Sequence, residues 1–580
     1  MPVFLCGRSF PYRFSARTNA DNLAHATRPI CLRDLLMKPA ATLKPPHLTA
    51  NFLRACLSDI KAGLFWQALP KLEPYGLIPP PENDSMEQAG ILYAICLAAT
   101  GKPEVAADIL AAVASRHSAS QHPLHDLAEL MTAQDRRAEA LVVAQALLRR
   151  TPDDTRVHAV LGSLLVQTGQ HEAAISVLKQ AVARVPDAML PRSLLAMALT
   201  EHGAMQAALD CLHPLPNNAT DRAATHANIG TILTGQGQMG EALSHFDAAL
   251  ALRPDDARVR FNRSVALLKA GDYAKGWQEH EWRHALPGHA AVPDNATLPA
   301  LNDATRLDGQ RVLLVHEEGL GDTLMYLRYV PSLAERGAIV HLLVPPALSQ
   351  LCQRVQGVHT VHVMRDGAPP LPRFDWYCGF ISLPRIFLHT QAPWGAPVPY
   401  LRADQEKTQA MAALLPSGKA LKVGLVWGGA PRANTLAAHI VDRRRSLPLS
   451  ALAPLGRLSG VKLISLQKGP YAEQMMDPPE GMRLYDPTDA LHSMDDTAAL
   501  IMGLDVVVSV DTSVAHLAAG LGKTVLLMDR YDNCWRWLHG REDTPWYPNL
   551  RIIRQTTPRQ WTDVVSRVAQ ALSAMARSRR

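Results

Sequence analysis

The sequence lacks the features that mark membrane-spanning, disulfide-rich and nucleic-acid-binding proteins. No run of about 18 apolar residues occurs, so we expect no membrane span. The eight cysteines are scattered and form no Cys-x-x-Cys pair or metal-like cluster, which favours a reducing, cytoplasmic compartment. The net charge is only +6 over 580 residues, and dense basic patches are confined to residues 443–445 and 577–580. Nucleic acid is therefore not an expected partner.

The composition is that of an ordinary folded protein with more than one domain. Hydrophobic residues make up 47% of the chain and charged residues 19%. The first 47 residues differ, because they hold several arginines and few acidic residues but no apolar segment typical of a secretory signal. We expect residues 1–47 to be a poorly ordered extension, and Met37 is an alternative start of the chain.

Residues 48–287 carry a repeat of 34 residues. Small residues recur seven positions before and five positions after a shared glycine position, at which Asp135 fills one missing place. The glycines in this register are Gly101, Gly169, Gly203, Gly237 and Gly271. Gly63 indicates a further, offset repeat at the start of the region. This period, with small residues where helices cross, is typical of tetratricopeptide repeats, so we predict an α-solenoid with a concave groove for extended peptides.

Two asparagines occupy equivalent positions of consecutive repeats. Asn228 and Asn262 each lie two residues before a small residue of the repeat pattern. The region resembles the repeats of protein O-GlcNAc transferases, in which a ladder of asparagines at this position grips the peptide backbone. The resemblance implies that Asn228 and Asn262 contact a peptide acceptor. Because Val160 and Leu194 occupy the preceding positions, the alternative is that both asparagines are merely solvated residues of the groove.

After the repeats the pattern changes from helices to alternating strands and helices. Residues 288–310 form a linker rich in Pro, Ala and Asn, and Trp277 and Trp282 before it are expected to pack at the seam with the next region. Short apolar runs predict two Rossmann-like α/β halves, at 311–402 and 403–580, the second ending in a terminal helix. The expected strands are residues 312–315, 338–344, 358–363, 374–377, 422–427, 461–467, 506–510, 524–528 and 550–554.

The first half opens on a strand that runs into a glycine-rich turn. Gly319 and Gly321 allow the chain to turn tightly beside a ligand, and Asp322 then begins a helix. Ligands of open parallel sheets bind at the carboxyl ends of strands, which is where this aspartate is expected. Glu317 and Glu318 flank the same crevice as weaker candidates for a catalytic base.

The second half contains a similar element about 190 residues later. Four valines within residues 506–510 predict a strand buried on both faces, and an apolar helix follows it directly. Backbone N–H groups and the macrodipole at the start of that helix suit an anion such as a diphosphate. Its candidate ligands are Asp511, Thr512, Ser513 and His516. The alternative is an ordinary crossover in which Asp511 or Thr512 simply caps the helix.

Together these two segments resemble the heptosyltransferase-like family 9 glycosyltransferases, which have the GT-B fold. The resemblance covers roughly the last 270 residues and implies that Asp322 is the catalytic base. It also implies that residues 511–516 hold the diphosphate of a nucleotide-sugar donor. Ser513 departs from the pattern, because many members of the family have glycine there.

Further candidates for donor binding lie between these two segments. A second strand-to-glycine turn ends at Gly428, and Arg445 and Ser446 lie in a basic loop that the resemblance places near the donor phosphates. Gln467 and Lys468 follow another expected strand, and Lys468 is a second cation for the leaving nucleotide. A bidentate guanidinium suits a diphosphate well, although a solvated basic loop is the alternative.

The expected activity is inverting transfer of a sugar from a nucleotide-sugar to a hydroxyl group. The sequence has no Asp-x-Asp triad, so neither a metal nor another cofactor is expected. The solenoid favours a protein acceptor, by analogy with O-GlcNAc transferases and with bacterial enzymes that modify flagellin. The alternatives are a catalytically inactive peptide-binding scaffold, a transferase acting on a lipopolysaccharide-type acceptor, and a nucleotide-sugar epimerase.

Overall fold

The protein is described by a computed structural model that covers residues 48–76, 84–115, 122–286, 296–365, 367, 371–432 and 436–579. The expected N-terminal extension and residues 288–295 of the expected linker lie outside the described residues. The chain divides into two compact units, whose boundary falls between Leu194 and Leu195.

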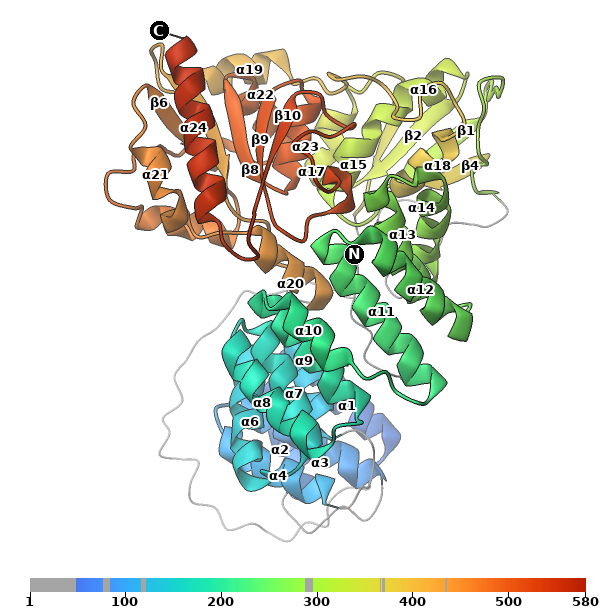
Figure 1. The fold of residues 1–580 in the computed structure, drawn as a ribbon, viewed down its shortest axis with the longest axis vertical. Coiled ribbons are helices and arrows are strands. Elements are labelled where there is room, and N and C mark those ends of the chain that lie inside the picture. The colour runs from blue at the N-terminus through green and yellow to red at the C-terminus, as the bar shows by residue number, and fades with distance from the viewer. Residues whose placement is uncertain are drawn as a thin grey trace. The chain divides into compact units, whose positions relative to one another are not determined.

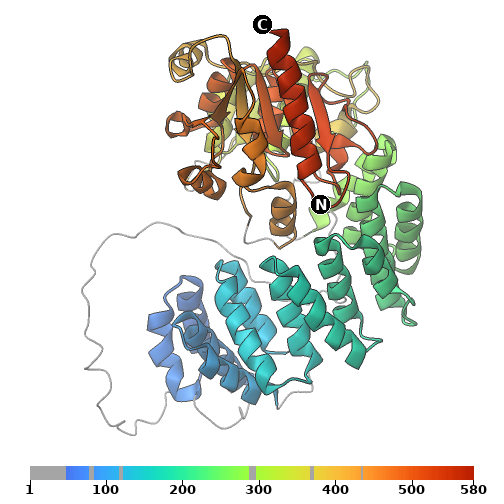
Figure 2. The same ribbon diagram turned by 60° about the vertical axis from the view of Figure 1, so that its left-hand side comes forward.

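The first unit consists of antiparallel helix pairs, as the 34-residue period predicts (Figure 1). Its helices are α1 (Ala50–Lys61), α2 (Phe65–Gly76), α3 (Asp84–Ala99), α4 (Pro103–Ala114), α5 (Leu124–Ala133), α6 (Arg137–Arg150), α7 (Thr155–Gln167) and α8 (His171–Arg184), followed by the start of α9 (Met189–His202). Successive pairs lie side by side in Figure 2. Pro152 and Pro186 come just after α6 and α8, as expected of residues that end the second helix of a pair.

The shared glycine position explains how each helix pair turns. Gly101, Gly169, Gly203, Gly237 and Gly271 all have φ between 82° and 93°, in the left-handed region that glycine enters without strain. Asp135, which fills the missing place in the register, adopts φ 59°. The small residues act as predicted too, since a Cβ atom on Gly162 would lie 2.5 Å from the Leu178 side chain. The repeat pattern therefore predicts both the turn within each helix pair and the positions where its helices pack closely.

The second unit, residues 195–580, contains the last repeat helices and both α/β halves. Its repeat helices are α10 (Met205–Leu212), α11 (Ala219–Gln236), α12 (Met239–Leu252), α13 (Ala257–Ala270) and α14 (Tyr273–His280), and the short helix η1 (Glu281–Ala285) follows. Trp277 of α14 is 2% exposed and packs edge-on against Trp535 and Tyr326. The predicted packing role of Trp277 is confirmed, and these repeats share a core with the α/β region.

The first half is a parallel sheet of four strands in the order β3-β2-β1-β4. The strands are β1 (Arg311–Val315), β2 (Ile339–Val344), β3 (Val358–Val363) and β4 (Trp376–Gly379). Its helices are α15 (Leu320–Tyr326), α16 (Val330–Glu335), α17 (Pro346–Cys352) and α18 (Leu383–Phe387), and a short helix, η4 (Phe380–Ser382), lies between β4 and α18. All four predicted strands are present, although β4 begins two residues later than expected.

The second half is a parallel sheet of six strands in the order β10-β9-β8-β5-β6-β7. The strands are β5 (Leu421–Val426), β6 (Val461–Ser465), β7 (Leu484–Tyr485), β8 (Val506–Val510), β9 (Thr524–Asp529) and β10 (Leu550–Arg554). Its helices are α19 (Gln405–Ala412), α20 (Leu436–Arg445), α21 (Ala453–Gly456), α22 (Met494–Met502), α23 (Ser513–Gly520) and α24 (Thr562–Ser578), and the short helix η8 (Trp535–Trp537) follows β9. Every strand of the sequence prediction is present, and β7 is additional.

The core explains why the two halves are held together. All five residues of β8 are buried, as its run of valines predicts. One face of the second sheet packs with α24 (Figure 1), and residues of α23 share a core with residues of α15 and of β1. An α-solenoid followed by two Rossmann-like halves is thus the fold, and the predicted GT-B architecture is confirmed. Within the described part of the chain, no helix has the combined length and apolar character needed to cross a bilayer.

Candidate functional site

The structure brings the two predicted motifs together. Helix α15 follows β1 and helix α23 follows β8, so both helices begin at the carboxyl ends of central parallel strands. The two helices pack against each other through Gly321, where an added Cβ atom would lie 3.0 Å from Cδ2 of His516 and 3.4 Å from Cα of Ser513. A larger residue at position 321 would push the helices apart. The glycine that the sequence singled out therefore permits the contact between the motifs.

Asp322 lies in the first turn of α15 and is largely buried. Its side chain is 15% exposed, and its Oδ2 accepts a hydrogen bond of 3.2 Å from the Gly319 N–H group. Its Oδ1 forms an ion pair with Nη2 of Arg536, which belongs to η8 of the other half. Burial raises the pKa of Asp322 above its ordinary value, while the Arg536 charge opposes that rise. A raised pKa makes the carboxylate a better proton acceptor.

His516 lies on α23 and faces aromatic side chains. Its ring stacks on Trp537 with a centroid distance of 5.2 Å, and its Nδ1 is 3.0 Å from the Tyr547 hydroxyl. Its Nε2 lies 3.9 Å from Oδ1 of Asp511. Burial lowers the pKa of His516 to about 4, although Asp511 opposes the shift. The imidazole is therefore neutral at pH 7, and it can offer a hydrogen bond but not a full charge.

The buried neutral His516 is expected to make stability depend on pH. Its pKa is about 4 in the folded protein and 6.5 in an unconstrained histidine, so only the unfolded chain takes up the proton between these values. Its contribution is complete above pH 6.5 and is lost as the pH falls towards 4. We expect a loss of about 2 kcal/mol between pH 7 and pH 5 from this residue. Urea denaturation of the wild type and of His516→Gln at both pH values measures it, and equal pH dependence in the two proteins would contradict it.

The start of α23 leaves its backbone without a side-chain cap. Thr512 occupies the N-cap position but makes no capping hydrogen bond, because its hydroxyl lies 3.0 Å from the Ser509 hydroxyl instead. Neither Thr512 nor Asp511 forms the side-chain cap that the alternative interpretation predicts. The first turn of α23 thus retains the positive end of the helix dipole beside Asp511 and Ser513.

Arg445 and Ser446 contact both the Gly428–Gly429 turn and the start of α23. Arg445 donates from Nη1 to the carbonyl oxygen of Asp511 at 2.6 Å, and its Nη2 pairs with Asp442 at 2.6 Å. Ser446 accepts a hydrogen bond of 3.1 Å from the Gly429 N–H group. An added Cβ atom on Gly429 would fall on the Arg445 guanidinium. These two predicted residues are therefore at the crevice, and their visible contacts order the loops around it.

Gln467 and Lys468 are engaged by the backbone of the second half. Gln467 accepts hydrogen bonds from the N–H groups of Trp427 and Gly428 at 2.9 and 2.8 Å, and donates to the Gly428 carbonyl at 2.9 Å. Lys468 donates from Nζ to the Thr488 carbonyl at 2.8 Å. Gln467 thus shapes the glycine turn, whereas the ammonium group of Lys468 is not brought to Asp322 or to α23.

Asn228 and Asn262 are both buried, with 0% of their surface exposed. Asn262 donates to the hydroxyl of Thr231 on the preceding repeat at 3.4 Å. The contacts of both asparagines with a peptide acceptor stay a prediction.

Glu317 is a structural residue and not a free carboxylate. It is 7% exposed and pairs with Arg283 of η1 at 3.1 Å, and its Oε2 accepts a hydrogen bond from the Ile381 N–H group. Arg283 also pairs with Glu281 at 2.7 Å and donates to the Ser382 hydroxyl at 2.7 Å. This buried network joins the last repeat to the first sheet, and it commits the Glu317 carboxylate to the fold. Glu318 is exposed and stays an alternative candidate, since its charge acts on Asp322.

Sequence reasoning assigned no role to Arg536. It lies 214 residues from Asp322 in the chain, within an aromatic-rich segment that matches no motif. The available signal was its place after β9, because loops at the carboxyl ends of parallel strands face the ligand crevice. Trp537 and Tyr547, which surround His516, were missed for the same reason.

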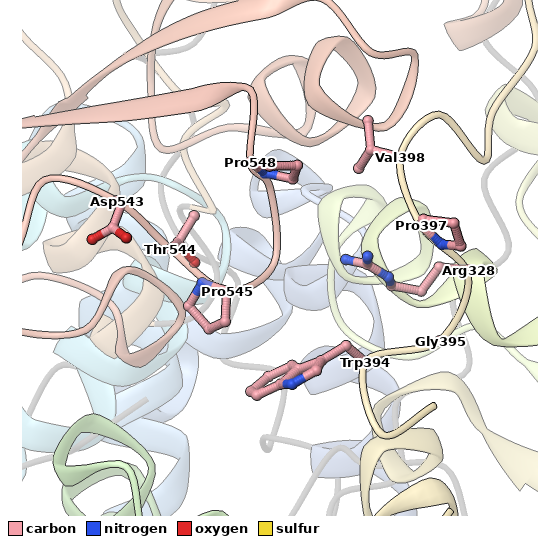
Figure 3. Close-up of a pocket in the computed structure, with 9 residues that line it drawn as sticks. All are labelled: Arg328, Trp394, Gly395, Pro397, Val398, Asp543, Thr544, Pro545 and Pro548. Atoms are coloured by element: carbon pink, nitrogen blue, oxygen red, sulfur yellow. The ribbon is translucent and has the colours of Figure 1, made fainter. Parts of the chain in front are cut away.

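A separate cavity of about 610 Å³ lies between segments of the two halves (Figure 3). Its lining consists of Arg328, Trp394, Gly395, Pro397, Val398, Asp543, Thr544, Pro545 and Pro548, none of which is a predicted site residue. Arg328 is committed to the structure, since it donates to the carbonyl oxygens of Ala396 at 3.0 Å and Trp546 at 2.6 Å. Among the described residues, no group of three or more His, Cys, Asp or Glu side chains is placed to hold a metal ion.

The comparisons with known proteins identify the first part of the chain. Tetratricopeptide repeat models match residues 88–164, 165–228 and 228–276. Residues 88–276 therefore consist of tetratricopeptide repeats, and the two α/β halves follow them. Protein FlbA of Caulobacter vibrioides is 27% identical over 376 residues, which cover 58% of this chain and 59% of FlbA. The match thus spans less than two thirds of that relative.

Several solved structures are similar to parts of the chain. A family 9 glycosyl transferase from Veillonella parvula covers 49% of this chain and 100% of its own, at 11% identity and a TM-score of 0.35. The ADP-heptose LPS heptosyltransferase II of E. coli covers 46% and 99%, at 14% identity and a TM-score of 0.34. The O-GlcNAc transferase of Thermobaculum terrenum covers 79% and 91%, at 15% identity and a TM-score of 0.26. The site described above therefore rests on the contacts within this chain.

Proposed function

We propose that this protein is an inverting glycosyltransferase that moves a sugar from a nucleotide-sugar to a hydroxyl group of a protein held by the repeats. The observation that carries the proposal is the contact between Gly321 and His516, which places Asp322 beside the start of α23. A proton acceptor and an anion-binding helix end are the two parts that this reaction needs. They come from opposite halves and from segments about 190 residues apart in the sequence.

In the proposed reaction, Asp322 accepts the proton of the acceptor hydroxyl. The hydroxyl oxygen forms a bond to the anomeric carbon while the bond from that carbon to the donor diphosphate breaks. The diphosphate leaves with the bonding electrons, and its charge is stabilised by the N–H groups and dipole of α23 and by the neutral imidazole of His516. Metal independence is part of the proposal, because these groups take the role of the cation.

The repeats supply the argument for a protein acceptor. Tetratricopeptide repeats stack into a solenoid whose concave face suits extended peptides, and the last repeats share a core with the α/β halves. Flagellin is one acceptor worth testing, in keeping with the resemblance to flagellin-modifying enzymes. The inactive scaffold and the lipopolysaccharide-type acceptor are the two alternatives that the following test separates.

The test combines donor binding with detection of the labelled acceptor. The full chain is titrated with UDP-, GDP-, ADP- and CMP-sugars by thermal shift, and a donor that binds is then supplied in radiolabelled form with a lysate from cells that lack the protein. We expect one class of donor to bind and label to appear on a protein band. Label on a lipid would show that the acceptor is a glycolipid and not a protein. If no donor binds, the proposed glycosyltransferase activity is contradicted.

A further inference from the structure

The ion pair between Asp322 and Arg536 connects the two halves at the centre of the candidate site. Asp322 belongs to α15 of the first half and Arg536 to η8 of the second, and their side chains are 15% and 11% exposed. In this arrangement a guanidinium group occupies one oxygen of the carboxylate that is proposed to accept a proton. Proton transfer requires that oxygen or its neighbour to be available to the acceptor hydroxyl.

Arg536 has hydrogen-bonding capacity beyond this pair. Its Nη1 donates to the Cys534 sulfur at 3.0 Å, which is a weak acceptor, and its Nε is buried without a partner among the described residues. The guanidinium also stacks on the Trp535 ring with its Cζ 4.4 Å from the ring centroid. A buried arginine whose N–H groups are only partly satisfied is suited to a ligand with several anionic oxygens.

The two other predicted cations have partners that hold them in place. Arg445 is held by the Asp511 carbonyl and the Asp442 carboxylate, although its Nε is also buried without a hydrogen-bond partner among the described residues. Lys468 is held by the Thr488 carbonyl. Arg536 differs from both, because its strongest partner is the side chain of Asp322, which has its own task in the reaction. The guanidinium of Arg536 pairs with Asp322 on α15, and the charge of Asp511, just before α23, also acts on it.

We propose that Arg536 exchanges partners during the reaction: it pairs with Asp322 in the absence of donor, and it binds the donor diphosphate when the nucleotide-sugar enters. This inference rests on the proposed function. The exchange releases the Asp322 carboxylate for the acceptor proton at the moment when a leaving group is present. As the bond between the anomeric carbon and the diphosphate breaks, Arg536 stabilises the charge that develops on the diphosphate. Asp322 holds the proton that the acceptor hydroxyl has lost.

The proposal predicts opposite effects for its two residues on the binding of product nucleotide. We would titrate UDP, GDP and ADP into the full chain by calorimetry and use whichever the wild type binds. Arg536→Gln removes the diphosphate ligand, so we expect at least about 10-fold weaker binding. Asp322→Asn removes the competing partner of Arg536, so we expect about 3- to 10-fold tighter binding. In the double variant the gain from Asp322→Asn should disappear.

Two further variants make the result independent of folding defects. Arg536→Lys keeps the charge but not the planar fork, and should bind with intermediate affinity. Arg541→Gln is the matched control, since Arg541 lies in the same segment but forms an exposed pair with Asp543, and its loss should leave affinity unchanged. The melting temperature of each variant shows whether it is folded.

The outcomes separate this inference from the proposed function. If the wild type binds none of the nucleotides and transfers no sugar, the proposed function fails. If the wild type binds but folded Arg536→Gln or Arg536→Lys binds equally well, only the partner exchange is overturned. Weaker or unchanged binding by Asp322→Asn also overturns it, because a purely structural ion pair would not compete with the ligand.

Discussion

Asp322→Asn is expected to lower the rate of sugar transfer by about 10²- to 10⁴-fold, which is the usual contribution of a general base. Asparagine is close in size to aspartate, and it can still accept the 3.2 Å hydrogen bond from the Gly319 N–H group. It cannot accept the proton of the acceptor hydroxyl. The measurement is a steady-state assay with the donor and acceptor identified by the labelling experiment, with kcat and KM determined separately.

The pattern of the kinetic constants distinguishes a base from a binding residue. Loss of the base lowers kcat without weakening the donor, whereas loss of a donor ligand raises the donor KM. Asp308→Asn is a suitable control, because Asp308 is exposed and pairs only with Arg306 among the described contacts. If the kcat of Asp322→Asn is within about twofold of the wild-type value, Asp322 is not the catalytic base.

Arg283→Met is expected to cost about 3–5 kcal/mol of stability, the usual effect of breaking a buried ion pair by removing one partner. The Arg283 side chain is 0% exposed and contacts the carboxylates of Glu317 and Glu281 and the hydroxyl of Ser382. Without it, the buried Glu317 carboxylate loses its guanidinium partner. Urea denaturation followed by tryptophan fluorescence is a direct measurement, because Trp277 lies nearby in the last repeat helix.

Two comparisons show whether the cost comes from the uncompensated charge. Arg306→Met breaks an exposed pair with Asp308, whose expected contribution is only about 0–1 kcal/mol. Adding Glu317→Gln to Arg283→Met removes one of the carboxylates left behind, and should recover part of the loss. If Arg283→Met costs no more than Arg306→Met, the network does not hold the last repeat to the first sheet.

The sequence predicted the framework well because its signals are local. The valines of β8 and the apolar run of β1 are strands buried on both faces, and such runs stand out whatever surrounds them. The 34-residue register identified the turns as well, including Asp135 at a position otherwise held by glycine. The strand β7 was missed because it has only two residues and forms only by pairing with β6.

The site was predicted in part, because its remaining features depend on contacts distant in the chain. Asp322 and His516 follow recognisable strand-to-helix turns, and the helices that carry them pack together. Nothing near Arg536 in the sequence indicates that it pairs with a carboxylate of the other half. The contacts that Asn228 and Asn262 are expected to make with an acceptor stay a prediction, because the repeat register fixes where a residue lies along a helix but not what it binds.

The position of the boundary at Leu195 has a practical consequence for dissecting this protein. Trp277 of α14 is buried against Tyr326 and Trp535, and Val265 and Leu268 of α13 belong to the same core. A fragment that starts at β1 would expose these aromatic side chains to solvent. It would also lack Arg283, the buried ion-pair partner of Glu317. An expression fragment or a chimaera with exchanged repeats should therefore keep α9 through α14 attached to the sheets. The last repeats are thus part of the same folded unit as the α/β halves, and only the repeats before them can be exchanged without exposing this core.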